Sequence, residues 1–198
     1  MCGRFYIPEK ELDDFARLVS EVEKHLLKKH GEIYPGDTVP IITPNNGERE
    51  VHAVKWGFPS HQGKKLIINA RSETVSEKPM FKAPFQKRRC LIPATGFYEW
   101  KANGNKKIKH FISIDNKLFY MAGLYWFFRD KNNENVIFPA FTILTTNANN
   151  KMQAVHDRMP VIIDESNIEK WLFSNDTGEL KSMLCAVGSD KTYISEVS

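Results

Sequence analysis

The stretch RRCLIPATGFYEWK, residues 88–101, joins two apolar runs through a proline, a threonine and a glycine. Aliphatic and aromatic runs bounded by turn-forming residues are typical of short β-strands, so we expect strands over residues 90–92 and 96–100. The second run carries a carboxylate, Glu99, between Tyr98 and Trp100. This side chain is either the outward-facing residue of an alternating strand or a group placed among aromatic rings for chemistry.

Similar short β-rich segments, separated by Pro and Gly, occupy most of the chain. Further strands are expected over residues 39–43, 51–58, 66–69, 110–114, 118–127, 136–145 and 160–163. No repeat or long linker interrupts this pattern. The regular spacing of these segments indicates one sheet-rich unit.

Helical spacing of apolar residues predicts one long amphipathic helix over residues 9–30 and a short helix over residues 80–86. Two more helices are expected near the C-terminus, over residues 164–173 with an Asp-Glu-Ser cap and over residues 177–185. We therefore predict an α+β fold in a single domain over residues 1–198. Its sheet would be curved or barrel-like and mostly antiparallel, with peripheral helices.

The composition, with 41% hydrophobic and 26% charged residues, is typical of a soluble globular protein. No apolar stretch is long enough to span a bilayer, and the first residues lack the apolar core of a secretory signal. We expect a cytoplasmic protein without membrane attachment. The three cysteines are widely separated and the six histidines form no metal-binding spacing, so we expect reduced thiols, no metal and no cofactor.

The net charge of +4 is concentrated in two basic runs, residues 86–89 (QKRR) and 106–110 (KKIKH). A modest basic excess suits a polyanionic partner such as nucleic acid without requiring one. Each run is either a solvated turn or a phosphate contact, and the sequence leaves both interpretations open.

Four segments place polar, reactive residues inside strand-like sequence: residues 2–4 (CGR), 69–73 (NARSE), 96–100 (GFYEW) and 155–160 (VHDRMP). Each has an ordinary structural explanation, as a frayed terminus, a strand end, an outward strand residue or a turn with a local His-Asp ion pair. One sequence does not show whether they meet in space.

The order and identity of these segments resemble a known family. MCGRF (1–5), PGDTVPII (35–42), WGF (56–58), INARSET (68–74), RRCLIPATGFYEWK (88–101), TTNAN (145–149) and VHDRMPVII (155–163) are similar to the SRAP (SOS response-associated peptidase) family. These are abasic-site processing proteins, which shield damage in single-stranded DNA by covalent attachment. The matches span most of the chain.

The resemblance implies a sensor of abasic sites in single-stranded DNA that acts as a monomer and is nucleoid-associated when bound to DNA. Cys2 would form a thiazolidine crosslink with the abasic sugar after removal of Met1, which shields the site. Family members have also been proposed to remove the residue ahead of Cys2 themselves, as peptidases.

The resemblance also assigns site residues. Catalytic roles fall to Cys2, Asn69, Glu99 and His156. DNA contacts fall to Arg4, Arg71 and Arg158, which would bind phosphates, and to Pro35 and Trp56 on the DNA-facing surface. Some relatives carry tryptophans shortly after the WG segment that wedge against a duplex end. Ser60 and His61 follow Pro59 here, so the resemblance gives less support to a preference for single-strand to duplex junctions.

The residue types suit this chemistry. An abasic sugar is mainly a closed hemiacetal, and a desolvated carboxyl such as Glu99 suits the proton transfer that opens it. The α-amine of an N-terminal Cys2, with a reference pKa of about 7.7–8.0, can condense with the aldehyde to an imine. The thiol of the same residue then closes a five-membered ring intramolecularly, while His156 titrates in the range needed to move protons.

Two alternatives from other functional classes remain. Cys2 could be the N-terminal nucleophile of a cysteine peptidase or amidohydrolase, assisted by His156 and by Asn69 or Glu99. The polar segments could instead contact nucleic acid without covalent chemistry, a reading that composition alone slightly favours.

Overall fold

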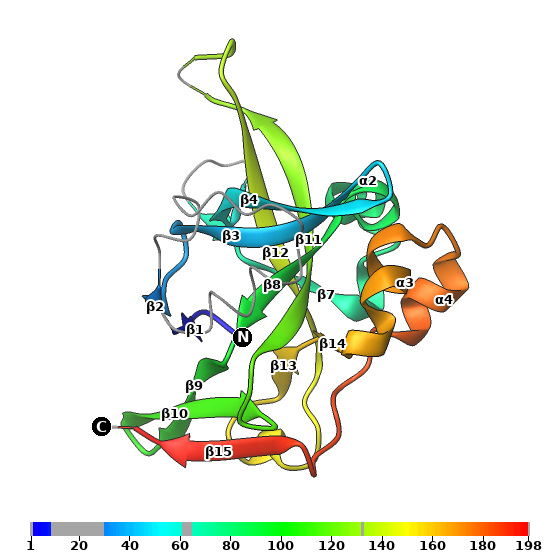
Figure 1. The fold of residues 1–198 in the computed structure, drawn as a ribbon. Helices are drawn as coiled ribbons and strands as arrows, with labels where there is room; N and C mark the ends of the chain where they lie inside the picture. Colours follow the sequence, from blue (N-terminus) through cyan, green and yellow to red (C-terminus); the bar gives the residue numbers. More distant parts are fainter. Residues whose placement is uncertain (1, 9–29, 61–64, 132, 198) are drawn as a thin grey trace.

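The computed structural model describes residues 2–8, 30–60, 65–131 and 133–197, and Figure 1 shows how their strands and helices are arranged. The helix expected over residues 9–30 lies outside the described residues except for His30, which precedes a strand. Met1 and His61 also lie outside them. Within the described ranges, no helix is long and apolar enough to cross a membrane.

Five strands form a closed barrel: β3 (Thr38–Asn45), β4 (Glu48–Trp56), β8 (Arg89–Ala94), β11 (Phe119–Arg129) and β12 (Ile137–Asn147). They pair in the order β12-β4-β3-β8-β11, and β11 pairs again with β12, which closes the ring. Every pair is antiparallel except β4 with β12. The predicted barrel-like, mostly antiparallel sheet is confirmed.

Successive residues of the barrel strands alternate between two hydrophobic clusters. Ile41 and Ile92 belong to an inner cluster that also contains Cys2, whereas their neighbours Ile42 and Leu91 belong to an outer cluster. Because side chains alternate between the faces of a strand, one face converges on the barrel axis and the other faces the helices. Both faces are therefore buried, which explains the nearly continuous apolar runs in the sequence.

A second, antiparallel sheet closes one end of the barrel. Its order is β15 (Thr192–Glu196), β10 (Lys106–Ile114), β9 (Gly96–Asn103), β1 (Phe5–Ile7) and β2 (Gly31–Ile33). Phe5, Phe97 and Ile112 of this sheet join the inner cluster. The sequence did not predict β1, β2 or β15.

The chain passes from the barrel to the second sheet inside the segment 88–101, between β8 and β9. The Thr95 N–H donates to the Tyr6 oxygen at 3.0 Å, which ties this passage to β1. Gly96 lies against the ring of Phe111, where a Cβ atom would come within 2.0 Å of Cζ. A larger residue at position 96 would displace that ring, so the glycine is required by packing.

Two short strands flank the last residues of β12. β7 (Asn69–Arg71) pairs with β12 in parallel and β13 (Arg158–Pro160) pairs with it antiparallel. Thr145 is opposite both Arg71 and Pro160, so the two strands lie on opposite edges of β12. The remaining two-residue strands are β5 (Phe58–Pro59), β6 (Leu66–Ile67) and β14 (Ile162–Ile163).

Three short helices, α2 (Pro79–Lys87), α3 (Ile168–Phe173) and α4 (Thr177–Ser182), gather on the right side of the molecule in Figure 1. Their apolar faces bury Phe85, Trp171 and Leu180 in the outer cluster. Three single 3₁₀ turns cover residues Ser72–Thr74, Met152–Ala154 and Glu165–Asn167. The predicted peripheral helices within the described residues are confirmed.

One predicted helix cap is wrong. Asp164 occupies the N-cap position ahead of the turn that leads into α3, but its side chain makes no capping hydrogen bond and lies 3.8 Å from Lys191 Nζ. Asp176 does cap α4, since its carboxylate accepts from the N–H groups of Gly178 and Glu179. Side-chain capping of that kind satisfies backbone donors that have no partner inside the helix.

The buried guanidinium of Arg89 connects the barrel to the helices. It donates five hydrogen bonds, of 2.5 to 3.3 Å, to backbone oxygens at helix ends: Phe85, Gln86, Trp171, Leu172 and Ser174. Burial lowers the pKa of Arg89 to about 10, so the group stays cationic at neutral pH. The terminal carbonyls of α2 and α3 depend on this one side chain for their partners.

Replacing Arg89 by methionine is expected to destabilise the fold by about 3 kcal/mol or more, because several buried carbonyls lose their donors together. Urea unfolding followed by circular dichroism measures the change. Lys87→Met is the matched control, since Lys87 is an exposed cation two residues before Arg89, and this variant should unfold near the wild-type midpoint. Equal midpoints for the two variants would contradict the role given to Arg89.

Candidate active site

Cys2 lies immediately ahead of β1 and is fully buried in the inner cluster. Its Sγ atom is 3.8 Å from the backbone oxygen of Arg4. Burial, and secondarily the negative charge of Glu99, raises the pKa of the thiol well above its ordinary value. The thiol is therefore protonated at neutral pH and shares an environment with the Glu99 carboxyl.

Asn69 begins β7 and contacts the same residue. Its Nδ2 donates to the Cys2 backbone oxygen at 2.9 Å. The side-chain oxygen of Asn69 is buried and has no hydrogen-bond partner among the described residues. Asn69 therefore holds the backbone of residue 2 and keeps an acceptor beside it.

Glu99 lies in β9 with only 3% of its surface exposed. Desolvation raises the pKa of its carboxyl, and the charge of the nearby His156 offsets part of that rise. A carboxyl in this state is protonated more often at neutral pH than one in water, which is the property required of a general acid.

His156 faces Glu99 across the site, with 4.0 Å between Nε2 and Oε2. On its other side Nδ1 is 3.0 Å from the Arg158 N–H and 2.8 Å from Asp157 Oδ1. Nδ1 accepts from the N–H only when unprotonated and donates to Asp157 only when protonated, so the two contacts belong to different protonation states. The imidazole thus has a partner in either state.

Arg158 was expected to bind phosphate, and its placement does not fit that role. The residue is 7% exposed, and its guanidinium pairs with Glu73 and donates to Asn147 Oδ1 and the Thr145 oxygen. The hydrogen bond from Arg158, helped by its positive charge, lowers the pKa of the Glu73 carboxyl. Since both terminal nitrogens of its guanidinium are engaged inside the protein, Arg158 braces β13 and with it His156.

Trp56 does not lie on a DNA-facing surface either. Its side chain is fully buried, packs edge-on against Phe5 and parallel to Phe141, and donates from Nε1 to the Ile68 oxygen at 3.1 Å. Burial removes the apolar indole ring from water, and the hydrogen bond to the Ile68 oxygen satisfies its N–H. Its role is to anchor the residue before Asn69.

Arg4 is partly exposed and belongs to a cationic and aromatic cluster. Its guanidinium donates to Glu32 at 2.9 Å and lies 4.3 Å from the ring centroid of Tyr34 and 4.9 Å from that of Trp100. Lys109 Nζ binds the same carboxylate. Partial burial alone would raise the pKa of Glu32, but the bonds from Lys109 and Arg4 hold it below its ordinary value.

Arg71 and Pro35 are both exposed, as expected for residues that meet a ligand. Arg71 lines a groove of about 480 Å³ together with Asn69 and Lys78. The other lining residues are Ile67, Pro79, Met80 and Phe81. The groove therefore joins Asn69 to a surface that carries two cations and apolar side chains.

Sequence reasoning did not select Lys78, Tyr34 or Lys109 as site residues. Lys78 stands immediately before the predicted short helix, and Lys109 lies in a basic run that was noted without being placed. Tyr34 adjoins the PG turn. Folding places Lys78 in the same groove as Asn69, and it places Lys109 and Arg4 on the same carboxylate, Glu32.

The structure thus brings Cys2, Asn69, Glu99 and His156 into one site, although they come from four separate segments. Among the described residues, no group of three or more His, Cys, Asp or Glu side chains is arranged to hold a metal ion.

Comparison with known proteins gives full-length matches. The family profile described as "SOS response associated peptidase (SRAP)" matches residues 1–198. The abasic site processing protein YoqW of Bacillus subtilis is 34% identical over 215 residues, covering 100% of this chain and 92% of that protein. The abasic site processing protein YedK of Escherichia coli is 28% identical over 196 residues, covering 95% of this chain and 86% of that protein.

Solved structures share the fold. A crystal structure of a protein from Bacteroides thetaiotaomicron superposes with a TM-score of 0.85 at 28% identity, covering 100% of this chain and 92% of that one. A phage-related protein from Bordetella bronchiseptica superposes with a TM-score of 0.79 at 24% identity, covering 99% and 94% of the two chains.

Glu99→Gln is expected to stabilise the protein at neutral pH. Because the pKa of Glu99 is raised in the folded state, the wild-type protein loses stability as the pH rises from the unfolded value of about 4.3 through the folded one. The glutamine side chain of the variant does not ionise, so the variant does not lose stability in this way as the pH rises. Urea midpoints of the two proteins at about pH 4 and pH 7.5 should therefore differ more at the higher pH.

The exposed Glu77 provides the control for that measurement. Glu77→Gln should shift the midpoint by the same small amount at both pH values. A Glu99→Gln difference that does not change with pH would show that the carboxyl is not desolvated.

Proposed function

The chain belongs to the SRAP (SOS response associated peptidase) family, and from that premise we propose that it captures abasic sites in single-stranded DNA through a covalent bond to Cys2. The observation that carries the proposal is the convergence on residue 2 of a hydrogen bond from Asn69, the carboxyl of Glu99 and, beyond it, His156. Removal of Met1 would expose an amine next to the thiol.

The reaction begins with the sugar. Glu99, whose raised pKa favours the protonated carboxyl, would donate a proton to the ring oxygen while the C1 hydroxyl of the sugar loses its proton, and the hemiacetal opens to the aldehyde. The Cys2 amine adds to the aldehyde carbon, and loss of one water gives the imine. His156, whose Nε2 is 4.0 Å from Glu99 Oε2, would receive the proton that the amine releases.

Ring closure then uses the thiol of the same residue. Sulfur adds to the imine carbon, the S–H proton goes to the nitrogen, and the product is a thiazolidine with no further leaving group. The net change is aldehyde plus cysteine to thiazolidine plus water. The ring closes within one residue, so its high effective molarity compensates for a thiol that burial keeps protonated.

The same burial argues against the peptidase alternative. A cysteine that attacks an amide needs a thiolate, and such cysteines have pKa values lowered by a cation or a helix N-terminus. Here burial and the Glu99 charge raise the pKa of Cys2. The site favours addition to an activated imine over attack on a peptide.

DNA would approach along the groove beside Asn69. Arg71 and Lys78 supply cations for the phosphates, and the apolar side chains of the groove supply contact surface. Tyr34 and Pro35 present a further exposed surface near Arg4. A site without a base offers no base edge to read, so sequence-independent binding that weakens with salt is expected.

A single-stranded oligonucleotide with one abasic site should give a heat-stable shifted band with the purified protein on a denaturing gel. Cys2→Ala should abolish the band, whereas Cys185→Ala, which removes an exposed thiol, should leave it intact. Intact mass should show loss of Met1 before the adduct forms, and a tag ahead of Cys2 should block it. If Cys185→Ala removes the band, or Cys2→Ala retains it, the assignment to Cys2 fails.

Glu99→Gln is expected to slow adduct formation about tenfold or more, because the amide is no proton donor for ring opening. Binding to a strand that carries a stable abasic analogue, measured by fluorescence anisotropy, should stay near the wild-type value. Glu77→Gln should change neither quantity. Loss of binding in parallel with loss of rate would assign Glu99 a structural role instead.

A further inference from the structure

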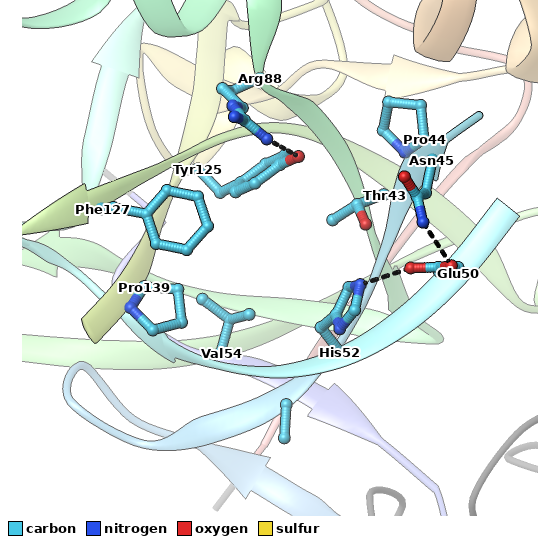
Figure 2. Close-up of a pocket in the computed structure, with 11 residues that line it drawn as sticks. Thr43, Pro44, Asn45, Glu50, His52, Val54, Arg88, Tyr125, Phe127 and Pro139 are labelled. Atoms are coloured by element: carbon cyan, nitrogen blue, oxygen red, sulfur yellow. Dashed lines mark hydrogen bonds and ion pairs between the residues drawn. The ribbon is translucent and has the colours of Figure 1, made fainter. Parts of the chain in front are cut away.

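The barrel end away from Cys2 is open and forms a cavity of about 500 Å³, shown in Figure 2. Its lining residues are Thr43, Pro44, Asn45, Glu50, His52, Ala53, Val54, Arg88, Tyr125, Phe127 and Pro139. They come from β3, β4, β11 and β12 and from the residue that precedes β8. Alternate members of this lining, such as Tyr125 and Phe127 of β11, point toward the barrel axis.

This cavity is separate from the candidate active site. Along β12 it begins at Pro139, whereas β7 and β13 flank residues 143–147. At a rise of about 3.3 Å per residue, Pro139 and Thr145 are about 20 Å apart. The inner cluster fills the barrel between the two ends.

Arg88 supplies the cationic side of the cavity. Its guanidinium lies 5.4 Å from the ring centroid of Phe127 and 5.7 Å from that of Tyr125, and Nη1 donates to the Tyr125 hydroxyl at 3.3 Å. In the part of the chain that the structure describes, no carboxylate lies within ion-pair distance of Arg88. The guanidinium therefore has donors and charge available for an anion.

Phe127 supplies a stacking surface. It is 47% exposed, although the residues two and more positions earlier on the same face of β11 are buried. An exposed ring beside an arginine is the arrangement on which nucleic-acid bases stack. Val54 and Pro139 extend the apolar surface around it.

Glu50 supplies an acceptor on the other side of the cavity from Arg88, as Figure 2 shows. Asn45 Nδ2 donates to one of its oxygens at 2.7 Å, and His52 Nε2 is 3.1 Å from the other. The carboxylate is thereby held in place, and it accepts N–H groups such as the exocyclic amine of cytosine or adenine.

We propose that this barrel mouth binds a nucleotide unit, with its phosphate on Arg88, its base against Phe127 and an amino-bearing base edge toward Glu50. The cavity volume lies in the range of small-molecule sites, which occur at the mouths of β-barrels. The inference goes beyond abasic-site capture, because no residue of this cavity belongs to the candidate active site.

Isothermal titration of the full chain with deoxycytidine 5′-monophosphate tests the proposal. Saturable binding is expected, weakened about tenfold in Arg88→Ala, which corresponds to the loss of one charge-assisted hydrogen bond. Lys87→Ala removes the same charge from an exposed neighbour outside the cavity and should bind as wild type. Phe127→Ala should weaken binding, and Ile137→Ala, an exposed residue of the same hairpin, should not.

Further ligands identify the source of the nucleotide. Inorganic phosphate should bind more weakly than the nucleotide, and thymidine 5′-monophosphate more weakly than the cytidine form. An undamaged oligodeoxycytidylate whose binding depends on Arg88 indicates a strand as the natural ligand, whereas dependence with the mononucleotide alone indicates a free nucleotide.

Two results would overturn the proposal: no saturable binding of either ligand, or equal losses in Arg88→Ala and Lys87→Ala. Crosslinking to an abasic oligonucleotide, measured on the same variants, keeps the two proposals apart. Arg88→Ala should form the adduct as wild type does, so failure at the barrel mouth leaves capture standing, and failure of capture leaves nucleotide binding testable.

Discussion

The pairing of two short strands with the end of β12 is the constraint on which the candidate active site depends. Thr145 is opposite Arg71 of β7 on one edge and Pro160 of β13 on the other. The Arg158 guanidinium stabilises this junction by hydrogen bonds to the Thr145 oxygen and to the Glu73 carboxylate. Asn69 lies two residues before Arg71 of β7, and His156 lies two residues before Arg158 of β13. The pairing of these strands with β12 therefore sets the separation of Asn69 and His156, and their own loops do not.

Burial at the closed end of the barrel changes the pKa values of Glu99 and Cys2 together. It raises the pKa of the Glu99 carboxyl, which favours the protonated form, and that of the Cys2 thiol, which favours the thiol over the thiolate. The same desolvation costs folding free energy whenever Glu99 ionises. In the proposed reaction such a site trades stability for selectivity, since the sulfur would add only to an electrophile already bound to residue 2.

The sequence predicted most of the barrel because both faces of its strands are buried and their apolar runs are long. It did not predict β1, β2 or β15, which are short and take their stability from pairing with β9 and β10. The residues Asn69, Glu99 and His156 were chosen by family resemblance, and their convergence could not be derived from spacing. Arg158 and Trp56 show why a motif alone does not decide a role, because a polar or aromatic residue in a motif is selected equally by a ligand and by an internal bond, and both side chains make internal bonds here.

The basic run 86–89 shows how little charge alone determines. Lys87 is exposed at the end of α2, Arg88 projects into the barrel mouth, and Arg89 is buried as a donor to helix ends. The different environments of these three side chains follow from their positions at the end of α2 and the start of β8. Side chains alternate along an extended chain. Arg88, just before β8, therefore points toward the barrel axis, and Arg89, the first residue of β8, points toward the helices. A charge that meets only carbonyls stabilises the fold, whereas one that meets exposed rings remains available to a ligand, and this difference is what separates Arg88 from its neighbour.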